Sequence, residues 1–448
     1  TYYDTPDQAL RRQSMALRVR QVGEAQWLQT LKTGGAAGGA LSQRGEWEAP
    51  VPDGRLSRAM LAATPWAEWD ADGALFAALQ PLFTTRFERL SWVLELAGSR
   101  VEVALDLGQV EIDGHSTPLC ELEIELLEGE PAALFDAAWH IGQQLSLLPL
   151  HMSKAERAYR LAAGTLDEPL RARPPLLTRQ MALGSVVQSV LRESFLQFTA
   201  NLYSLRASDA PEVLHQARVG WRRFKSGLQL FKQLGKRSGL PELAALKPLL
   251  AQMAQVRDLD VAASEVFPAF AASYRSLHAK RMAPWHRLED ALAQDLAQQR
   301  AVLRQLLCDP AVGRCLLLLT RWLELESALP GRHPARHAKH PAAHWLRQRI
   351  AKLAAQMQAT AKGRLGPKAQ HRLRIQSKRL RYGVESLRSL LPKKRAERWY
   401  HQATQLQTDI GLARDRLLAI RTAERLLAPP GMVLFLRDAV LHGGSAAL

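Results

Sequence analysis

The sequence predicts two domains of different fold class, an antiparallel β domain over about the first 160 residues and an all-α domain after it. Apolar and charged residues alternate with a period of two up to about residue 150, and beyond a proline-rich stretch the apolar spacing becomes helical. The charge balance changes at the same place: residues 1–160 contain 14 Lys and Arg against 22 Asp and Glu, while the chain of 448 residues carries +17. This length also favours two domains.

Strands are predicted where apolar residues alternate with charged ones. The segments 15–20, 101–106 and 121–126 show this alternation, which is typical of strands with one charged face. Glycines at 34–39 indicate a hairpin loop, and the stretch 74–81 has the spacing of a short helix between strands. The first domain is therefore expected to be mostly sheet.

A linker is predicted at 167–175, where three prolines occur. Gly235, Gly366 and Pro392 are expected to stop or break helices in the part that follows. The simplest interpretation of this part is a helical bundle of two similar halves. The predicted helices are 185–192, 214–234, 241–256, 289–307, 342–361 and 371–391.

The helical half contains one basic motif twice. The stretch from His215 to Lys225 recurs from His371 to Arg381, and in both a histidine is followed by bases at offsets 3, 7, 8 and 10. Offsets 0, 3, 7 and 10 lie within about 80° of arc on a helix, so each copy predicts a narrow cationic stripe. Like charges at this spacing destabilise a helix by roughly 0.2–0.5 kcal/mol per pair unless an anion offsets them. The motif therefore predicts a polyanion ligand.

An Arg-Asp pair follows each copy of the motif at nearly the same distance. Asp258 follows Arg257 in the first case, and Asp415 follows Arg414 in the second. The repeat is therefore a long helical module, and the two aspartates are expected to brace neighbouring bases by ion pairing.

Cysteine usage and hydropathy exclude several classes of protein. Cys120, Cys308 and Cys315 show neither paired nor metal-ligand spacing, which predicts a reducing compartment, the cytosol, rather than a disulfide scaffold or a zinc site. The longest apolar run, 315–319, is far too short to span a membrane. Neither a Walker A sequence nor a dinucleotide-binding fingerprint occurs, so a P-loop or Rossmann mechanism is not favoured.

Charged strand faces indicate a possible chemistry for the first domain. The glutamates at 121, 123 and 125 would lie on one strand face in steps of roughly 6.5–7 Å, which by itself suggests a solvated surface. If this face converges with basic strand faces, the interior offers cations for phosphate oxygens and carboxylates for Mg²⁺ or Mn²⁺, a set that suits phosphoryl transfer. The basic residues of such faces are Arg18, Arg20, Lys32, Arg44 and Arg89.

An ordered series of motifs over about residues 1–162 resembles the CYTH domain. The resemblance implies an antiparallel β-barrel whose charged tunnel binds triphosphates together with a divalent metal, Mg²⁺ or Mn²⁺. The motifs are Tyr3-Asp4-Thr5-Pro6-Asp7, Leu17-Arg18-Val19-Arg20, Leu31-Lys32, Arg44-Gly45-Glu46-Trp47-Glu48, Leu105-Asp106-x-Gly108, Cys120 to Leu126 and Ser153-Lys154.

The helical half, over about residues 181–442, resembles the CHAD domain through its two histidine-centred stripes and its two Arg-Asp pairs. Residues 163–180 then form the linker. A CYTH domain followed by a CHAD domain is similar to bacterial inorganic triphosphatases. The resemblance implies that the barrel hydrolyses tripolyphosphate to diphosphate and phosphate. It also implies that the helical domain binds inorganic polyphosphate, which would place the protein on polyphosphate granules in the cytoplasm.

Roles are expected for the residues at matching positions. Glu46 and Glu48 either take part in the chemistry or hold arginines in place, and both histidines donate hydrogen bonds to phosphate while partly charged near pH 7. The expected phosphate-binding residues of the barrel are Arg18, Arg20, Lys32, Arg44, Arg89 and Lys154. The expected metal ligands are Glu121, Glu123, Glu125 and Asp106. The expected polyphosphate-binding residues are His215, Arg218, Arg222, Arg223, Lys225, His371, Arg374, Lys378, Arg379 and Arg381.

One departure from the CYTH pattern concerns the start of the chain. The family carries a Glu-x-Glu-x-Lys signature in its first strand, and this chain opens on Thr1, inside a predicted strand that comes later, so we expect the signature strand to precede Thr1. If that strand is absent, the sequence favours a non-catalytic polyphosphate-binding or nucleic-acid-binding protein. The barrel motifs alone also leave thiamine triphosphatase and a class IV adenylate cyclase open.

Nucleic acid is the less expected polyanion for the helical half. Proteins that bind single strands stack bases on aromatic side chains interleaved with cations. The two motifs contain only Trp221, Phe224 and Tyr382, and no aromatic position recurs in both copies. Phosphate recognition without base stacking is the better interpretation.

Overall fold

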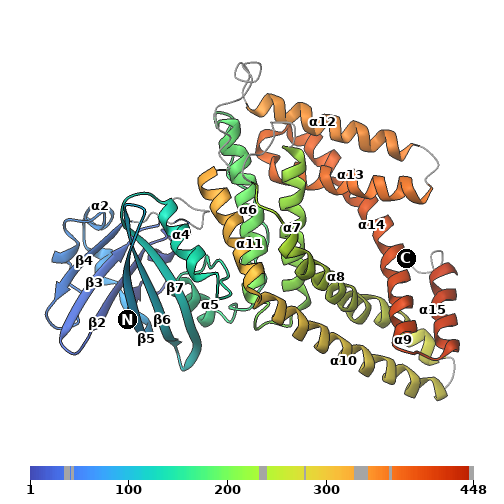
Figure 1. Cartoon of the computed structure of the whole chain (residues 1–448), viewed down its shortest axis with the longest axis horizontal. Coiled ribbons are helices and arrows are strands. Elements are labelled where there is room, and N and C mark those ends of the chain that lie inside the picture. Colours follow the sequence, from blue (N-terminus) through green and yellow to red (C-terminus); the bar gives the residue numbers. More distant parts are fainter. Residues whose placement is uncertain are drawn as a thin grey trace. The chain divides into compact units, whose positions relative to one another are not determined.

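The chain folds into two compact units in the computed structural model (Figure 1). The structure describes all residues except 35–40, 42–44, 232–239, 277–278, 327–341, 363–365 and 443–448. Residues 1–141 and 150–168 form the first unit, called the sheet unit here, and 142–149 and 169–448 form the second, the helical unit. The predicted order of an antiparallel sheet followed by helices is confirmed.

The sheet unit contains seven antiparallel strands in the order β4-β3-β2-β1-β5-β6-β7. Within the described residues, β4 and β7 are the edge strands, and the strand in which the chain opens, β1, lies between β2 and β5. The predicted strands at 15–20, 101–106 and 121–126 are all present. The strands are β1 (Tyr2–Asp4), β2 (Ala16–Val22), β3 (Gln26–Lys32), β4 (Glu46–Val51), β5 (Gln80–Leu96), β6 (Ser99–Ile112) and β7 (His115–Glu128).

Strand register gives the sheet one charged face. Arg18 of β2 lies opposite Thr30 of β3, and Thr30 lies opposite Glu48 of β4. In the other half of the sheet, Arg89 of β5 lies opposite Asp106 of β6, which lies opposite Glu121. Tyr2 of β1 pairs with both Arg18 and Phe83, and Phe83 precedes Arg89 by an even number of residues. Side chains alternate along a strand, so both charged sets lie on the same face.

Apolar side chains and short helices cover the opposite face. Leu17 and Leu31 are buried there with Leu10 of α1 and Trp66 of α2. Helix α4 packs against β6 and β7 in the same way, with Ala133 and Ala137 beside Val101 and Val103. The helices of this unit are α1 (Ala9–Arg12), α2 (Trp66–Trp69), α3 (Ala74–Ala77), α4 (Ala132–Ile141) and α5 (Lys154–Ala162). The helix predicted at 74–81 thus ends at Ala77, because β5 begins at Gln80.

Helix α5 packs on the charged face rather than on the apolar one. Its Ala158 and Tyr159 are buried against Tyr2, Phe83 and Val110, which share that face. The contact places the first residue of α5 among the charged side chains of β6 and β7. The sheet and this helix together therefore build the charged interior.

The helical unit contains ten α-helices in the described residues, and two hydrophobic clusters hold it together. The larger cluster joins helices from both halves of this unit, and the smaller one lies around Trp285 and Met432. None of the described helices is long and apolar enough to cross a membrane. The helices are α6 (Leu183–Ser204), α7 (Pro211–Leu230), α8 (Lys247–Val261), α9 (Phe267–Ser276), α10 (Met282–Leu307), α11 (Pro310–Arg321), α12 (Ala342–Ala361), α13 (Pro367–Ser386), α14 (Lys393–Arg425) and α15 (Pro430–His442).

Most predicted helices are present, but two end earlier than expected. Helix α7 ends at Leu230 instead of 234, and α13 ends at Ser386 instead of 391, where a 3-10 turn (Arg388–Leu390) replaces it. Gly366 and Pro392 are N-caps that precede α13 and α14, while Gly235 lies outside the described residues.

The two basic motifs lie on equivalent helices. The first lies on α7, which packs against α6, and the second on α13, which packs against α12. A glycine at offset 12 from the motif histidine recurs in both. A Cβ on Gly227 would lie 3.0 Å from Leu191, and one on Gly383 would lie 2.7 Å from Ile350. The glycine thus lets each motif helix pack closely against its partner without displacing that side chain.

Asp4 ties three elements of the sheet unit together. Its carboxylate is buried and accepts hydrogen bonds from the backbone nitrogens of Thr5 (2.7 Å), Leu10 (2.9 Å) and Arg11 (3.1 Å). It also accepts one from the Tyr159 hydroxyl at 2.5 Å. Burial and this hydrogen bond raise the pKa of Tyr159, so its hydroxyl stays a donor.

We expect Asp4→Ala to lower the free energy of unfolding of the sheet unit by about 3 kcal/mol, because several buried donors lose their acceptor at once. Urea unfolding followed by circular dichroism measures the change. The matched control is Glu24→Gln, an exposed carboxylate in the β2–β3 turn, which should change stability by less than about 0.5 kcal/mol. Equal stability of the two variants would contradict the role given to Asp4.

Candidate functional site

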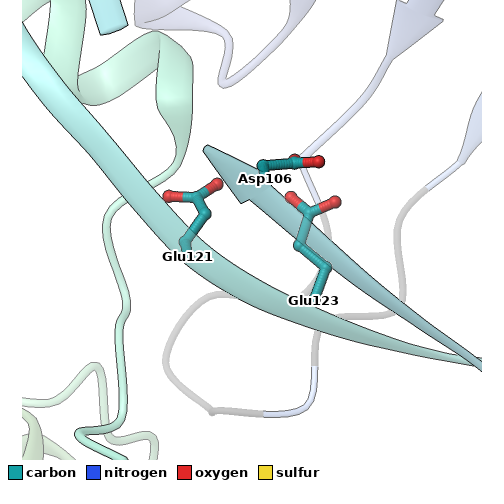
Figure 2. A group of neighbouring side chains, drawn as sticks. All are labelled: Asp106, Glu121 and Glu123. Carbon is teal, nitrogen blue, oxygen red and sulfur yellow. The ribbon is translucent and has the colours of Figure 1, made fainter. Parts of the chain in front are cut away.

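One lysine lies among three carboxylates on the charged face of the sheet. The Nζ atom of Lys154 lies 2.7 Å from Asp106 Oδ2 and 2.8 Å from Glu123 Oε1, and it also contacts Glu121. The Lys154 side chain is 6% exposed and that of Asp106 is 0% exposed. Figure 2 shows the three carboxylates, from β6 and β7, facing one another. Ser153 caps the start of α5 and thereby orients Lys154.

Two arginines complete the charge balance of this cluster. Arg89 holds Asp106 with two parallel bonds, from Nε to Oδ1 and from a terminal nitrogen to Oδ2, both 2.7 Å long, and reaches Glu123 at 2.6 Å. Arg157 of α5 lies 3.5 Å from Glu121 and donates to the carbonyl oxygen of Pro118 at 3.0 Å. Paired arginines and carboxylates of this kind give fixed geometry as well as charge.

Contacts within the cluster keep Asp106, Glu123 and Lys154 charged. Burial by itself would raise the pKa of Asp106, but hydrogen bonds from Arg89 and Lys154 hold it below its ordinary value. Burial would also raise the pKa of Glu123, but the charge and hydrogen bond of Lys154 together with the charge of Arg89 lower it. Burial opposes the charge on Lys154, yet the charges of Glu123 and Glu121 raise its pKa. At neutral pH Asp106 and Glu123 are therefore carboxylates and Lys154 is an ammonium.

These carboxylates fit a divalent cation. One oxygen each from Asp106, Glu121 and Glu123 lie within 4.8 Å of one another, and carboxylate oxygens are the ligands that Mg²⁺ and Mn²⁺ prefer. All three carboxylates also contact Lys154, so a bound metal would share them with the ammonium. Half-exposed Glu123 opens the group to solvent. Glu125 lies on the same strand face but is not part of this group.

A second set of ion pairs lies on β2, β3 and β4. Arg20 lies 2.8 Å from Glu48, whose carboxylate also accepts from Thr30 at 3.0 Å. Glu46 lies 2.8 Å from Lys32 and 4.0 Å from Arg18. Glu46 and Glu48 were expected either to take part in the chemistry or to hold basic side chains in place. Both contact bases of this set.

Arg18 and Arg20 retain donors for a ligand. The Nε atoms of both side chains are buried and have no hydrogen-bond partner within the described residues. A phosphate oxygen would satisfy such a donor, so the donors fit an anionic ligand on this face. Arg44, expected to join this set, lies outside the described residues.

In the helical unit, the two motifs meet at one cavity of about 530 Å³. Its lining includes the predicted residues His215, Arg222, Arg223, Arg374, Lys378 and Arg381. Two carboxylates, Glu385 and Asp415, also line it, so bases outnumber acids there. The side chain of Arg414, which precedes Asp415, lies outside the described residues.

The two motif histidines are not equivalent. His215 lines the cavity, and burial together with the charge of Arg257 lowers its pKa to about 4. It is therefore neutral at pH 7, which corrects the expectation of a partly charged ring. His371 is exposed and does not line the cavity. Three other predicted residues, Arg218, Lys225 and Arg379, are likewise not among its lining residues.

Some lining residues were not found from the sequence. Arg388 follows Arg381 by seven residues, which nearly repeats its direction on a helix, so an extended search for basic spacing would have found it. Ala172 and Pro174 come from the predicted linker, and no sequence signal places them at the cavity. Glu385 is a further lining residue without a counterpart in the basic motif.

Comparison with known proteins agrees with this division. The CYTH domain family matches residues 1–159, and the CHAD domain family matches residues 189–424. The sheet with its charged face thus corresponds to the CYTH match, and the helical unit with its basic cavity to the CHAD match. The CHAD match covers more than half of the chain, so the chain belongs to the CHAD domain family and carries a CYTH domain before it.

Two relatives extend this result. The chain is 34% identical over 165 residues to the inorganic triphosphatase of Haemophilus influenzae, a match that covers 36% of this chain and 45% of that protein. The chain thus spans less than half the length of this relative. The crystal structure of the CHAD domain from the plant Ricinus communis is 25% identical, with a TM-score of 0.51, and the match covers 61% of this chain and 90% of that one.

We expect the stability of the sheet unit to fall as the pH decreases below about 4.5. Asp106 and Glu123 have lowered pKa values in the folded protein, so their contribution is present above their ordinary values of 3.8 and 4.5 and is lost as the pH falls through the folded values. Thermal unfolding of the sheet unit between pH 6 and pH 3, with a metal chelator present, measures this loss.

Lys154→Met should lower the free energy of unfolding of the sheet unit by about 3 kcal/mol at pH 7, because the carboxylates keep Arg89 and Arg157 but lose the buried ammonium that contacts all three of them. The acid loss of stability should also move to higher pH, since the carboxyl pKa values rise without the ammonium. Arg86→Met, which removes an exposed base on β5, is the control. An unchanged pH profile in Lys154→Met would contradict the coupling described above.

Proposed function

We propose that the sheet unit hydrolyses inorganic triphosphate with Mg²⁺ or Mn²⁺, and that the helical unit binds inorganic polyphosphate. The observation that carries the first half is the placement of Asp106, Glu121 and Glu123 on the same sheet face as Arg18 and Arg20. Carboxylates for a metal and bases for phosphate thus share one interior. The triphosphatase relative and the CYTH match support this chemistry.

Each set of residues has a separate task in this reaction. Arg18, Arg20 and Lys32 bind and neutralise phosphate oxygens, while Glu46 and Glu48 keep those bases in position before the substrate arrives. The carboxylates of β6 and β7 would hold the metal, and a metal bound there would neutralise phosphate charge and help to orient the attacking water. Arg89 and Lys154 fix these carboxylates, so the site is organised in advance.

Polyphosphate is the polyanion that the cavity of α7 and α13 fits best. Six Lys and Arg side chains line it against two carboxylates, and neutral His215 can still donate one hydrogen bond. The aromatic residues of the motifs, Trp221, Phe224 and Tyr382, are buried and are not free to stack on bases. These facts favour a phosphate chain over single-stranded nucleic acid.

We expect the protein to release phosphate from tripolyphosphate in the presence of Mg²⁺ or Mn²⁺, and chelation should abolish the activity. Glu123→Gln should reduce the rate by about a hundredfold, because a metal ligand is lost. Glu88→Gln, an exposed carboxylate on β5, should have no effect. Thiamine triphosphate and ATP are measured in parallel, and faster turnover of either would replace the proposed substrate. No turnover of any triphosphate would leave a binding protein.

We expect long-chain polyphosphate to bind with an affinity that weakens steeply with salt, as for other polyanions neutralised by Lys and Arg. Arg374→Met should raise the Kd about tenfold, since a charge-assisted hydrogen bond in the cavity is lost. Lys225→Met, the control, removes a motif base outside the cavity and should change the Kd little. Duplex DNA should compete poorly, and equal competition would contradict the preference for polyphosphate.

A further inference from the structure

One carboxylate in the basic cavity joins the two repeats. Glu385 of α13 accepts a hydrogen bond from Arg223 of α7 at 2.6 Å and another from Arg381 of α13 at 2.8 Å. The two bonds use different oxygens of the same carboxylate. Arg223 belongs to the first basic motif and Arg381 to the second. Glu385 is therefore bonded to one base from each copy.

The ion pairs of Glu385 are more enclosed than most in this unit. The side chains of Arg223, Glu385 and Arg381 are 7%, 18% and 22% exposed. Arg381 is held further by Gln407, 3.2 Å from its Nε, and its guanidinium lies 4.5 Å from the centroid of the Tyr382 ring. Enclosed pairs with several bonds keep a fixed geometry, in contrast to exposed pairs that exchange readily.

A carboxylate in this place is unfavourable for anion binding on charge alone. It partly cancels the positive charge of the cavity and repels phosphate. A compensating benefit is that both guanidiniums stand in defined positions before a ligand arrives, which lowers the ordering cost of binding. The repulsion between Arg223 and Arg381 is offset at the same time.

We propose that Glu385 is a positioning residue of the polyphosphate site, which holds Arg223 and Arg381 so that a phosphate chain meets both repeats in one preformed arrangement. The inference rests on polyphosphate binding by the helical unit, as proposed above. Glu385 acts through the two arginines and need not contact the ligand. The geometry of its two hydrogen bonds carries the argument.

Charge and positioning predict opposite results for Glu385→Gln. The substitution removes a negative charge from the cavity, so charge alone predicts tighter polyphosphate binding. Positioning predicts weaker binding, because the amide has a single oxygen and can accept well from only one arginine. We expect the Kd to rise about tenfold.

Glu385→Asp is a second variant that distinguishes the positioning role from an effect of charge alone. It keeps the charge but shortens the side chain by one methylene, so it cannot reach both arginines in the same geometry. Positioning again predicts a higher Kd, whereas charge alone predicts no change. The slope of log Kd against log salt should become shallower by about one in both variants, as one phosphate contact is lost.

The matched control is Asp290→Asn on α10, which removes the negative charge of an exposed carboxylate. Asp290 does not line the cavity, so its charge holds none of the cavity bases in place. Removing its charge should leave the Kd unchanged or lower it. All variants are measured as full chains by titration with long-chain inorganic polyphosphate, below the temperature at which each begins to unfold.

The outcomes are distinguishable. A Kd for Glu385→Gln that equals or falls below that of the wild type, with Glu385→Asp unchanged, overturns the positioning role and leaves polyphosphate binding intact. Absence of binding by the wild type overturns the proposed function and this inference together. If Glu385→Gln does not fold, Glu385→Asp decides by its Kd and its salt slope.

Discussion

Repulsion between like charges that crowd on one face is the constraint on which both units depend. In the sheet unit, three carboxylates lie within 4.8 Å of one another, and Lys154 contacts all of them. In the helical unit, bases from two motifs line one cavity, and Glu385 bonds to a base from each motif. In the sheet unit one lysine offsets the repulsion among acids. In the helical unit one carboxylate offsets the repulsion among bases.

The packing of helices and strands determines where these counter-ions lie. Lys154 is the first residue of α5, so its ammonium reaches the carboxylates only because α5 packs on the charged face of the sheet. Asp4 fixes that packing from β1 through Tyr159. The chemistry of the site is thus tied to the core, since an error in docking α5 would remove Lys154 and Arg157 from Glu121 and leave Asp106 with Arg89 alone.

Internal ion pairs also fix the positions of basic side chains in both units. Glu48 holds Arg20 in the sheet unit, as Glu385 holds Arg381 in the helical unit, so bases stand in place before a ligand arrives. Under the proposed function, a phosphate chain would meet bases that already have fixed positions. Burial of Trp221 and Phe224 in the helical core removes the surfaces on which bases would stack. Packing, in addition to charge, therefore disfavours ligands that need base stacking.

Spacing along the chain was enough to predict strands, helices and the repeated stripe, because it sets the angle between side chains within one element. Arg374, Lys378 and Arg381 share a helix face for that reason. Tertiary packing alone decided which bases meet across helices. It makes His215 neutral beside Arg257 while His371 stays exposed, and it brings Ala172 and Pro174 to the cavity. Distances between elements depend on close contacts such as that at Gly383, and no local pattern encodes them.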